Sequence, residues 1–346
     1  MLEQNSWMAR EIAAVPDALL QQEATVMQPV RELVGRLLRS PPQLVVTCAR
    51  GSSAHAATFC KHLIEHWLGI PVCAAAPSIS SIYGRELRLR GQLVLVISQS
   101  GTSDDLIAFA RCARNAGALT VAVTNSGSSP LTATCELTLP IVAGPEVSIA
   151  ATKTFIATMC VLLRLVAAWA GNNAQKGVLR ALPNHLSEAM TMNWGSAVEA
   201  LAETSSLATI GRGPTLAIAR EAALKLKETC NLHAEAFSSA EFMHGPVSLA
   251  SQRYPILMFM PSDAALAGMR DVAAAVSKKG CRVFLAGPSN SNPGPYISLP
   301  GRTTHSAAVD AICLIQSFYC MLVRLAERRG CDVDNPPHLQ KITRTT

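Results

Sequence analysis

The chain has 346 residues, which is enough for about two domains of ordinary size. Hydrophobic residues make up 49% of it and charged residues only 16%, a composition that favours a large buried core and excludes a mostly disordered chain. The net charge of +6 is spread along the sequence, with no run of Lys and Arg longer than three residues, so it is as compatible with an anionic small molecule as with a nucleic acid.

Residues 6–39 are predicted to be helical, with a break near Pro29. The first 16 residues lack the basic region followed by an apolar one that marks a signal peptide. The eleven cysteines show no CxxC spacing, and several lie in apolar runs. We therefore expect a cytoplasmic protein.

From residue 43 onward, short β-rich runs alternate with longer helical stretches, a pattern that predicts parallel sheets wrapped by helices. Four strands are expected in each half of the chain: 44–47, 93–98, 120–124, 136–142, 207–210, 255–260, 282–286 and 296–300. The longest apolar stretch, 155–170, is interrupted by Arg164 and is too short to span a bilayer, so we expect a buried helix.

The two halves keep the same spacing. Residues that follow corresponding strands are 162 positions apart: Gly51 and Gly213, Ser100 and Ser262, Asn125 and Gly287. We predict a duplicated α/β fold with two tandem, doubly wound, parallel-sheet domains. The expected boundaries are an N-terminal helical segment (1–42), a first domain (43–175), a second domain (195–330) and an extended C-terminal tail (331–346).

The segment SQSGTSDD, residues 98–105, follows an apolar strand and precedes a helix. Such a turn aims backbone N–H groups and a helix N-terminus at an anion, and Gly101 lets the backbone approach the ligand closely. A plain turn with a helix cap is the alternative. Four hydroxyl residues in the segment favour a phosphate site: Ser98, Ser100, Thr102 and Ser103. One strand earlier, Gly51, Ser52 and Ser53 repeat this design more weakly.

The segment 221–246 concentrates acidic and basic side chains. Glu221, Lys225 and Glu228 share one helix face. Taken alone, this row of charges is most simply interpreted as a solvent-exposed face of the helix. The residues that follow are rich in His and Glu: His233, Glu235, Glu241 and His244. Proton transfer beside a carbonyl needs a base such as these. No metal-binding spacing is present, so no metal site is expected.

In the tail, two prolines at positions 336 and 337 forbid a helix, so an irregular, extended strap is expected there. The tail contains Lys341, which on composition alone would simply be solvated.

These motifs together resemble the sugar isomerase (SIS) family. The matching segments, in chain order, are M-x-x-E-I-x-x-x-P (8–16), SQSGTSDD, EVSIAATKTF (146–155), EAALKLKE (221–228), HAEAF (233–237), HGP (244–246) and the closing DVDNP…L-x-K. They are similar in particular to the isomerase half of glucosamine-6-phosphate synthase and to SIS-type glucosamine-6-phosphate deaminase.

The resemblance implies a role for each matching position. Phosphate would be held by Ser53, Ser98, Gln99, Ser100 and Ser103. The hydroxyl pattern of the loop adds Thr102 to this set. Gly51, Ser52 and Ile149 would make further substrate contacts. Glu228 would move a proton between C1 and C2, and Lys225 would bind sugar hydroxyls. His244 would catalyse ring opening, in the family sometimes from the other subunit of a homodimer, and Lys341 would close over the open-chain sugar.

Three positions depart from the family pattern: Arg50 replaces a Cys, Thr102 a Glu and Ala151 a Ser. Leu2 follows Met1 where the synthase has its nucleophilic Cys, so we expect no counterpart of the glutaminase domain of the synthase. We therefore expect that glutamine is not the ammonia source.

The expected function is deamination of glucosamine 6-phosphate to fructose 6-phosphate and ammonia, with no metal or organic cofactor. A small-molecule sugar phosphate is the expected partner, with no nucleic acid and no membrane. Another aldose–ketose phosphosugar isomerase or a fructosamine-phosphate deglycase is the alternative enzyme. A sugar-phosphate-sensing regulator is the alternative outside enzymes, although no basic helix-turn-helix segment precedes residue 43.

Overall fold

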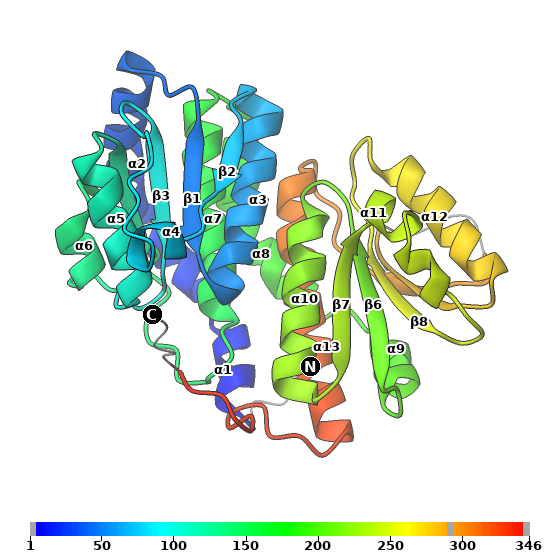
Figure 1. The fold of residues 1–346 in the computed structure, drawn as a ribbon. Helices are drawn as coiled ribbons and strands as arrows, with labels where there is room; N and C mark the ends of the chain where they lie inside the picture. Colours follow the sequence, from blue (N-terminus) through cyan, green and yellow to red (C-terminus); the bar gives the residue numbers. More distant parts are fainter. Residues whose placement is uncertain (1–4, 289–293, 342–346) are drawn as a thin grey trace. The chain divides into compact units, whose positions relative to one another are not determined.

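The computed structural model describes residues 5–288 and 294–341, and its chain folds into two compact units. Of these residues, the first unit contains 17–146, 153–177 and 340–341. The second unit contains 5–16, 147–152, 178–288 and 294–339. Each unit is built around one parallel sheet (Figure 1).

The sheet of the first unit has the strand order β2-β1-β3-β4-β5. Its strands are β1 (Val45–Ala49), β2 (Val72–Ala74), β3 (Leu93–Ile97), β4 (Leu119–Thr124) and β5 (Leu137–Pro140). The helices that lie mainly in this unit are α2 (Val15–Arg39), α3 (Gly51–Leu68), α4 (Ser78–Ser81), α5 (Asp104–Asn115), α6 (Pro130–Thr134) and α7 (Lys153–Trp169).

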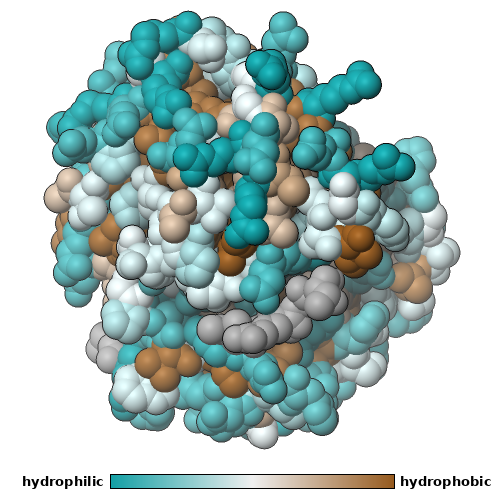
Figure 2. All heavy atoms as spheres, turned by 60° about the vertical axis from the view of Figure 1, so that its left-hand side comes forward, coloured by the Kyte–Doolittle hydropathy of each residue, from teal (hydrophilic) through white to brown (hydrophobic). Residues whose placement is uncertain are grey.

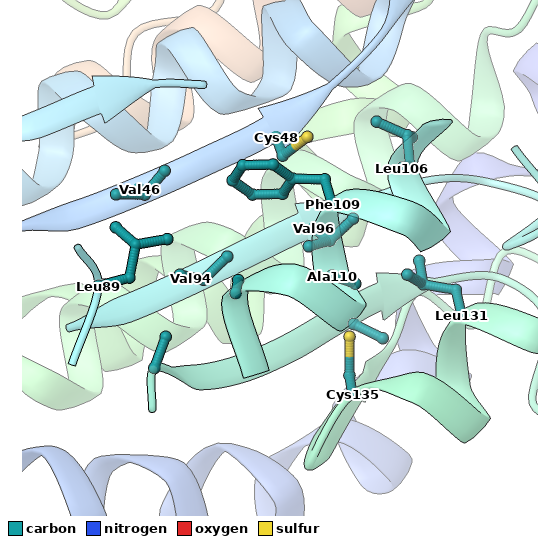
Figure 3. Close-up of a cluster of buried hydrophobic side chains, with 13 residues drawn as sticks. Val46, Cys48, Leu89, Val94, Val96, Leu106, Phe109, Ala110, Leu131 and Cys135 are labelled. Atoms are coloured by element: carbon teal, nitrogen blue, oxygen red, sulfur yellow. The ribbon is translucent and has the colours of Figure 1, made fainter. Parts of the chain in front are cut away.

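One hydrophobic core cluster of the first unit lies between the sheet and α5 (Figure 3). Val94 and Val96 alternate along β3, so both side chains point to one face, where they pack with Phe109 and Ala110 of α5. Every residue of β3 is buried, because helices cover both faces of this sheet. The carboxyl ends of its strands are therefore free to present loops at one edge.

The second sheet has the order β10-β9-β8-β6-β7. Its strands are β6 (Ser206–Gly211), β7 (His233–Ser238), β8 (Pro255–Phe259), β9 (Arg282–Gly287) and β10 (Ile297–Pro300). The helices that lie mainly in this unit are α1 (Trp7–Ala13), α8 (Ala174–Ala189), α9 (Gly195–Leu201), α10 (Thr215–Cys230), α11 (Ser239–Met243), the 3-10 helix η1 (Pro246–Leu249), α12 (Leu266–Lys278) and α13 (Ala307–Arg328).

The two sheets have the same topology, which confirms the predicted duplicated, doubly wound α/β fold. Read from β7, the second sheet runs β7-β6-β8-β9-β10, the order of the first sheet with each strand replaced by its counterpart. The buried helix expected over 155–170 is confirmed as α7, all but one of whose residues are buried. Residues 331–341 contain no helix or strand, as expected for the tail.

Two details of the sequence prediction are wrong. Each sheet has a fifth strand, β2 and β7, at an edge: β2 has only three residues, and β7 alternates exposed polar with buried residues, so neither forms an apolar run. Helix α2 also continues through Pro29, because Val26, Val30 and Leu33 pack into the core around it. The interruption instead falls at Ala14, between α1 and α2.

Among the described residues, α13 is long and apolar enough to cross a membrane by length and composition. Its most apolar 18-residue window is 94% buried inside the protein, as is usual for the core helix of a globular domain. On the face drawn in Figure 2, apolar residues are scattered among polar ones.

Candidate active site

The 98–103 loop joins β3 to the N-terminus of α5. Gly101 has a φ of +68°, a conformation that favours glycine, and its N–H donates to Ser98 Oγ at 3.2 Å. The hydroxyls of Ser100 and Thr102 lie 2.8 Å apart. The loop is thus a closed turn that gathers its hydroxyl groups at the carboxyl edge of the sheet.

The alternative is a plain turn with a helix cap, and the structure shows the turn without the side-chain cap. Ser103 is the N-cap residue of α5, yet its side chain makes no capping hydrogen bond. Ser98 is buried, Gln99, Ser100 and Ser103 are half-buried, and Thr102 is exposed. The structure therefore brings the five residues of the predicted phosphate segment into one turn, with hydroxyls that are not committed to capping the helix.

The second predicted loop begins α3. Gly51, at a φ of +51°, is its first residue, and Ser52 and Ser53 lie in its first turn, half-buried. Strand β1 is the direct neighbour of β3, and Ala49 pairs in register with Ile97. The two loops therefore start side by side at the same edge of the sheet.

Glu146 connects the 98–103 loop to the tail. Its buried carboxylate accepts hydrogen bonds from Gln99 Nε2 at 3.1 Å and from the backbone N–H of Thr154 at 3.1 Å. The ammonium of Lys341 lies 3.8 Å from the same carboxylate. Gln99 and Lys341 are thus brought together through Glu146, a residue without a role predicted from the motifs. Its only signal in the sequence is an acidic residue heading the apolar EVSIAATKTF motif.

In the second unit, α10 presents a buried row of charges. The side chains of Glu221 and Lys225 are 0% and 1% exposed, and that of Glu228 is 21% exposed. Lys225 Nζ lies 3.5 Å from Glu221 Oε1 and forms a short hydrogen bond to Glu228 Oε2. Tyr319 Oη donates to Glu221 at 3.2 Å. The prediction that this helix face is solvent-exposed is therefore wrong. Helix α13 packs against α10 and buries these charges, and this contact between distant segments cannot be predicted from the local sequence.

The His- and Glu-rich residues after α10 do not form one cluster. His233 and Glu235 lie exposed on β7, while Glu241 belongs to a capping box with Ser238 that starts α11. His244 ends α11 as its C-cap residue and is exposed. Of these four residues, Glu241 helps to cap the N-terminus of α11, and His244 lies at the end of this helix, directly before Gly245.

Ile149 lies on a segment that α1 anchors. The carboxylate of Glu11 forms a short hydrogen bond with the N–H of Val147 and accepts a longer one from the N–H of Ser148, whose hydroxyl it also binds. Ile149 itself is half-buried. Glu11 belongs to the opening M-x-x-E-I motif, so this motif fixes the backbone that carries Ile149.

Within residues 5–288 and 294–341, no group of three or more His, Cys, Asp or Glu side chains could hold a metal ion. All eleven cysteines are free thiols. Burial raises the pKa of Cys60 and of Cys160 to about 12, so these thiols are protonated at neutral pH.

The fold described above is a duplicated α/β domain, with two parallel sheets of the same topology. A family model described as "SIS domain" matches residues 37–168 and 200–292, and the chain belongs to this family.

Two relatives share substantial sequence identity with the chain. The glutamine–fructose-6-phosphate aminotransferase [isomerizing] of Streptomyces coelicolor is 30% identical over 364 residues, which cover 97% of this chain and 58% of the relative. The chain therefore spans little more than half the length of this curated relative. A solved structure from Silicibacter pomeroyi DSS-3, provisionally described as a phosphosugar isomerase, is 40% identical, with a TM-score of 0.90 over 95% of this chain and 100% of that one.

A third similarity concerns the fold alone. Glucosamine-6-phosphate deaminase from Thermotoga maritima aligns with a TM-score of 0.77 over 98% of this chain and 100% of that chain, at 20% sequence identity.

Proposed function

We propose that the chain is a phosphosugar enzyme that converts glucosamine 6-phosphate to fructose 6-phosphate and ammonia. The observation that carries the proposal is the row Glu221–Lys225–Glu228 on α10, in which a buried ammonium holds a partly exposed carboxylate. A carboxylate oriented in this way can act as a general base, as the deamination requires. Membership of the SIS family and the similarity to a provisionally assigned phosphosugar isomerase support the substrate class.

In the proposed reaction, the 98–103 loop, with Ser53, binds the phosphate through hydroxyl and backbone N–H donors. Gly51, Ser52 and Ile149 contact the sugar, and Lys225 binds its hydroxyls. His244 assists ring opening, which exposes the C1 aldehyde. Lys341 closes over the open chain.

Glu228 then removes the proton from C2 and delivers it to C1, while a proton passes from the C2 amine to the C1 oxygen. The C1 carbonyl thereby becomes a CH2OH group and the C2 amine becomes an imine. Water adds to the C2 imine and expels ammonia, leaving the C2 ketone of fructose 6-phosphate. Every atom is supplied by substrate and water.

We also propose that the protein is a cytoplasmic homodimer in which His244 acts on the substrate held by the partner subunit. The free state of the cysteines supports a reducing compartment. Mixing Glu228→Gln and His244→Asn subunits tests whether His244 acts on the substrate of the partner subunit. If subunit exchange between the two inactive variants restores activity, the shared site is supported. If the mixture stays inactive, the shared site is contradicted.

A second candidate is an aldose–ketose isomerase without deamination, which the 40% identical relative favours. The deciding assay incubates the purified full chain with glucosamine 6-phosphate and measures free ammonia and fructose 6-phosphate, with Glu228→Gln as the control for a contaminating enzyme. Equal amounts of both products support the deaminase. Conversion of another aldose phosphate without ammonia selects the isomerase, and release of an amine from a fructosamine phosphate selects the deglycase. Binding without any turnover indicates a sensor.

A further inference from the structure

Arg50 stands at the edge of the sheet where the two loops begin. It follows β1 directly and is the N-cap residue of α3, although its side chain makes no capping hydrogen bond. Because Ala49 pairs with Ile97, the next residues along the two strands, Arg50 and Ser98, are neighbours on adjacent parallel strands, which lie about 5 Å apart. Arg50 therefore starts beside the first residue of the 98–103 loop.

The guanidinium of Arg50 is tied to the other end of that loop. Its Nε and Nη2 donate to Asp105 Oδ2 at 3.0 and 2.7 Å, and Asp105 lies in the first turn of α5. The side chain of Asp105 is 1% exposed, whereas that of Arg50 is 54% exposed. The guanidinium thus spans from the start of the loop to its end and keeps a solvent-accessible side.

The ion pair with Asp105 fixes the orientation of the guanidinium of Arg50 but does not use all of its hydrogen-bond donors. A guanidinium carries five N–H donors, and the bonds to Asp105 use two of them. The second oxygen of Asp105 accepts the N–H of Leu106 at 2.8 Å, so the carboxylate is itself held in place. A planar cation immobilised in this way loses little side-chain entropy when an anion binds to its free side.

The local charges explain why a cation is needed there. Asp104 and Asp105 both lie in the first turn of α5, directly after the loop that is proposed to bind phosphate. Their negative charges oppose the approach of a phosphate dianion. Neutral hydroxyl and N–H donors alone would have to overcome that repulsion, whereas Arg50 neutralises Asp105 and adds donors of its own.

We propose that Arg50 is a phosphate-binding residue of this chain and that Asp105 is its positioning residue. Arg50 then selects phosphorylated over unphosphorylated sugars by a charge-assisted contact, in addition to the neutral donors of the 98–103 loop. The proposal rests on the proposed function only in taking a phosphorylated sugar as ligand, and it does not depend on which reaction follows binding.

The test measures binding of glucosamine 6-phosphate, inorganic phosphate and glucosamine by calorimetry to the full-length protein. For Arg50→Met we expect affinity for the two phosphate-containing ligands to fall roughly 10- to 100-fold, as for a lost charge-assisted hydrogen bond. Weak binding of glucosamine should not change. Arg50→Lys keeps the positive charge but loses the planar pair of N–H donors. Its affinity for the two phosphate-containing ligands should lie between those of the wild type and Arg50→Met. Arg36→Met removes another arginine of the same unit, paired with Glu136 at 2.9 Å, and should bind like wild type.

The double variant Arg50→Met/Asp105→Asn separates ligand binding from structural support. It removes both charges, so no buried carboxylate is left unpaired and folding is favoured even where the single variant unfolds. Weak phosphate binding by the folded double variant supports the proposal. Wild-type affinity in the double variant, or in Arg50→Met, overturns it, because Arg50 would then serve only to neutralise Asp105.

The outcome is distinguishable from failure of the proposed function. A wild-type protein that binds phosphate but releases no ammonia refutes the deaminase and leaves the Arg50 comparison valid. A wild-type protein that binds neither phosphate-containing ligand overturns both.

Discussion

The ammonium group of Lys341 lies 3.8 Å from Glu146 Oε2, an oxygen that also accepts a hydrogen bond from Gln99 Nε2 at 3.1 Å. The side chain of Glu146 is 0% exposed and that of Lys341 is 31% exposed. One buried carboxylate therefore connects the C-terminal tail to the loop proposed to bind phosphate, and it defines the position of the tail lysine in the first unit.

Replacing Glu146 with Gln should release the tail. The amide is nearly isosteric and keeps an acceptor for the N–H of Thr154, but it no longer attracts the ammonium of Lys341. We expect faster hydrogen exchange in residues 338–341 and a lower kcat with a smaller change in KM. The tail before them stays anchored, because the carboxylate of Asp334 accepts hydrogen bonds from the backbone N–H groups of Trp7 and Met8. Glu136→Gln, which breaks the exposed pair with Arg36, is the matched control and should leave both unchanged. Unaltered exchange in Glu146→Gln would show that the contact does not hold the tail.

Ser100→Ala should weaken binding of the sugar phosphate by about 1–3 kcal/mol, the range for a lost charge-assisted hydrogen bond. Calorimetric titrations with glucosamine 6-phosphate and with glucosamine measure the effect. The loss should be confined to the phosphorylated ligand. An equal loss with both ligands would contradict a role for Ser100 at the phosphate.

Gly101→Ala should disrupt the 98–103 loop. At a φ of +68°, an added Cβ would lie 2.3 Å from Ser129 Oγ. Gly144, at a φ of +67° with nothing within 4 Å of an added Cβ, is the matched control. Both alanine variants carry the left-handed backbone cost of about 1–2 kcal/mol, and only Gly101→Ala carries the clash in addition.

Thermal unfolding and phosphate binding should therefore separate the two glycine variants. Adding Ser129→Gly to Gly101→Ala should recover part of the loss, since it removes the clashing side chain. Identical unfolding of Gly101→Ala and Gly144→Ala would mean that the loop moves away from Ser129 at no cost.

The cysteines should differ sharply in reactivity. Cys73 is exposed on β2, whereas burial raises the pKa of Cys60 and of Cys160 to about 12. Because only the thiolate reacts, a thiol reagent at pH 8 should label Cys73 rapidly in the native protein and leave Cys60 and Cys160 unmodified until it unfolds. Peptide mapping after a short labelling pulse identifies the sites. Early labelling of Cys160 would indicate that α7 is not packed as described.

The sequence predicted the fold well because the central strands are continuous apolar runs and because the two halves repeat at a constant spacing. It missed β2 because this edge strand has only three residues, and it missed β7 because exposed polar residues, His233 and Glu235, interrupt its apolar ones. The 98–103 loop was predictable from a local pattern of strand, hydroxyl-rich turn and helix. These features all depend on near neighbours in the chain.

The remaining parts of the candidate site depend on distant contacts. The pair Arg50–Asp105 spans 55 positions, and the contact between Glu146 and Lys341 spans still more of the chain. The burial of Lys225 depends on packing in the second unit that no helical periodicity reveals. The roles assigned to Glu228, His244 and Lys341 came from family resemblance, and periodicity alone could not have supplied them.

The most direct measurement compares Glu228→Gln with wild type for turnover of glucosamine 6-phosphate and for its binding. If Glu228 is the general base, turnover should fall at least about 100-fold, the usual contribution of such a group, while the dissociation constant of the sugar phosphate stays close to the wild-type value. Glu235→Gln, which changes an exposed residue of β7, should keep full activity. A Glu228→Gln protein that releases ammonia at the wild-type rate would contradict the account.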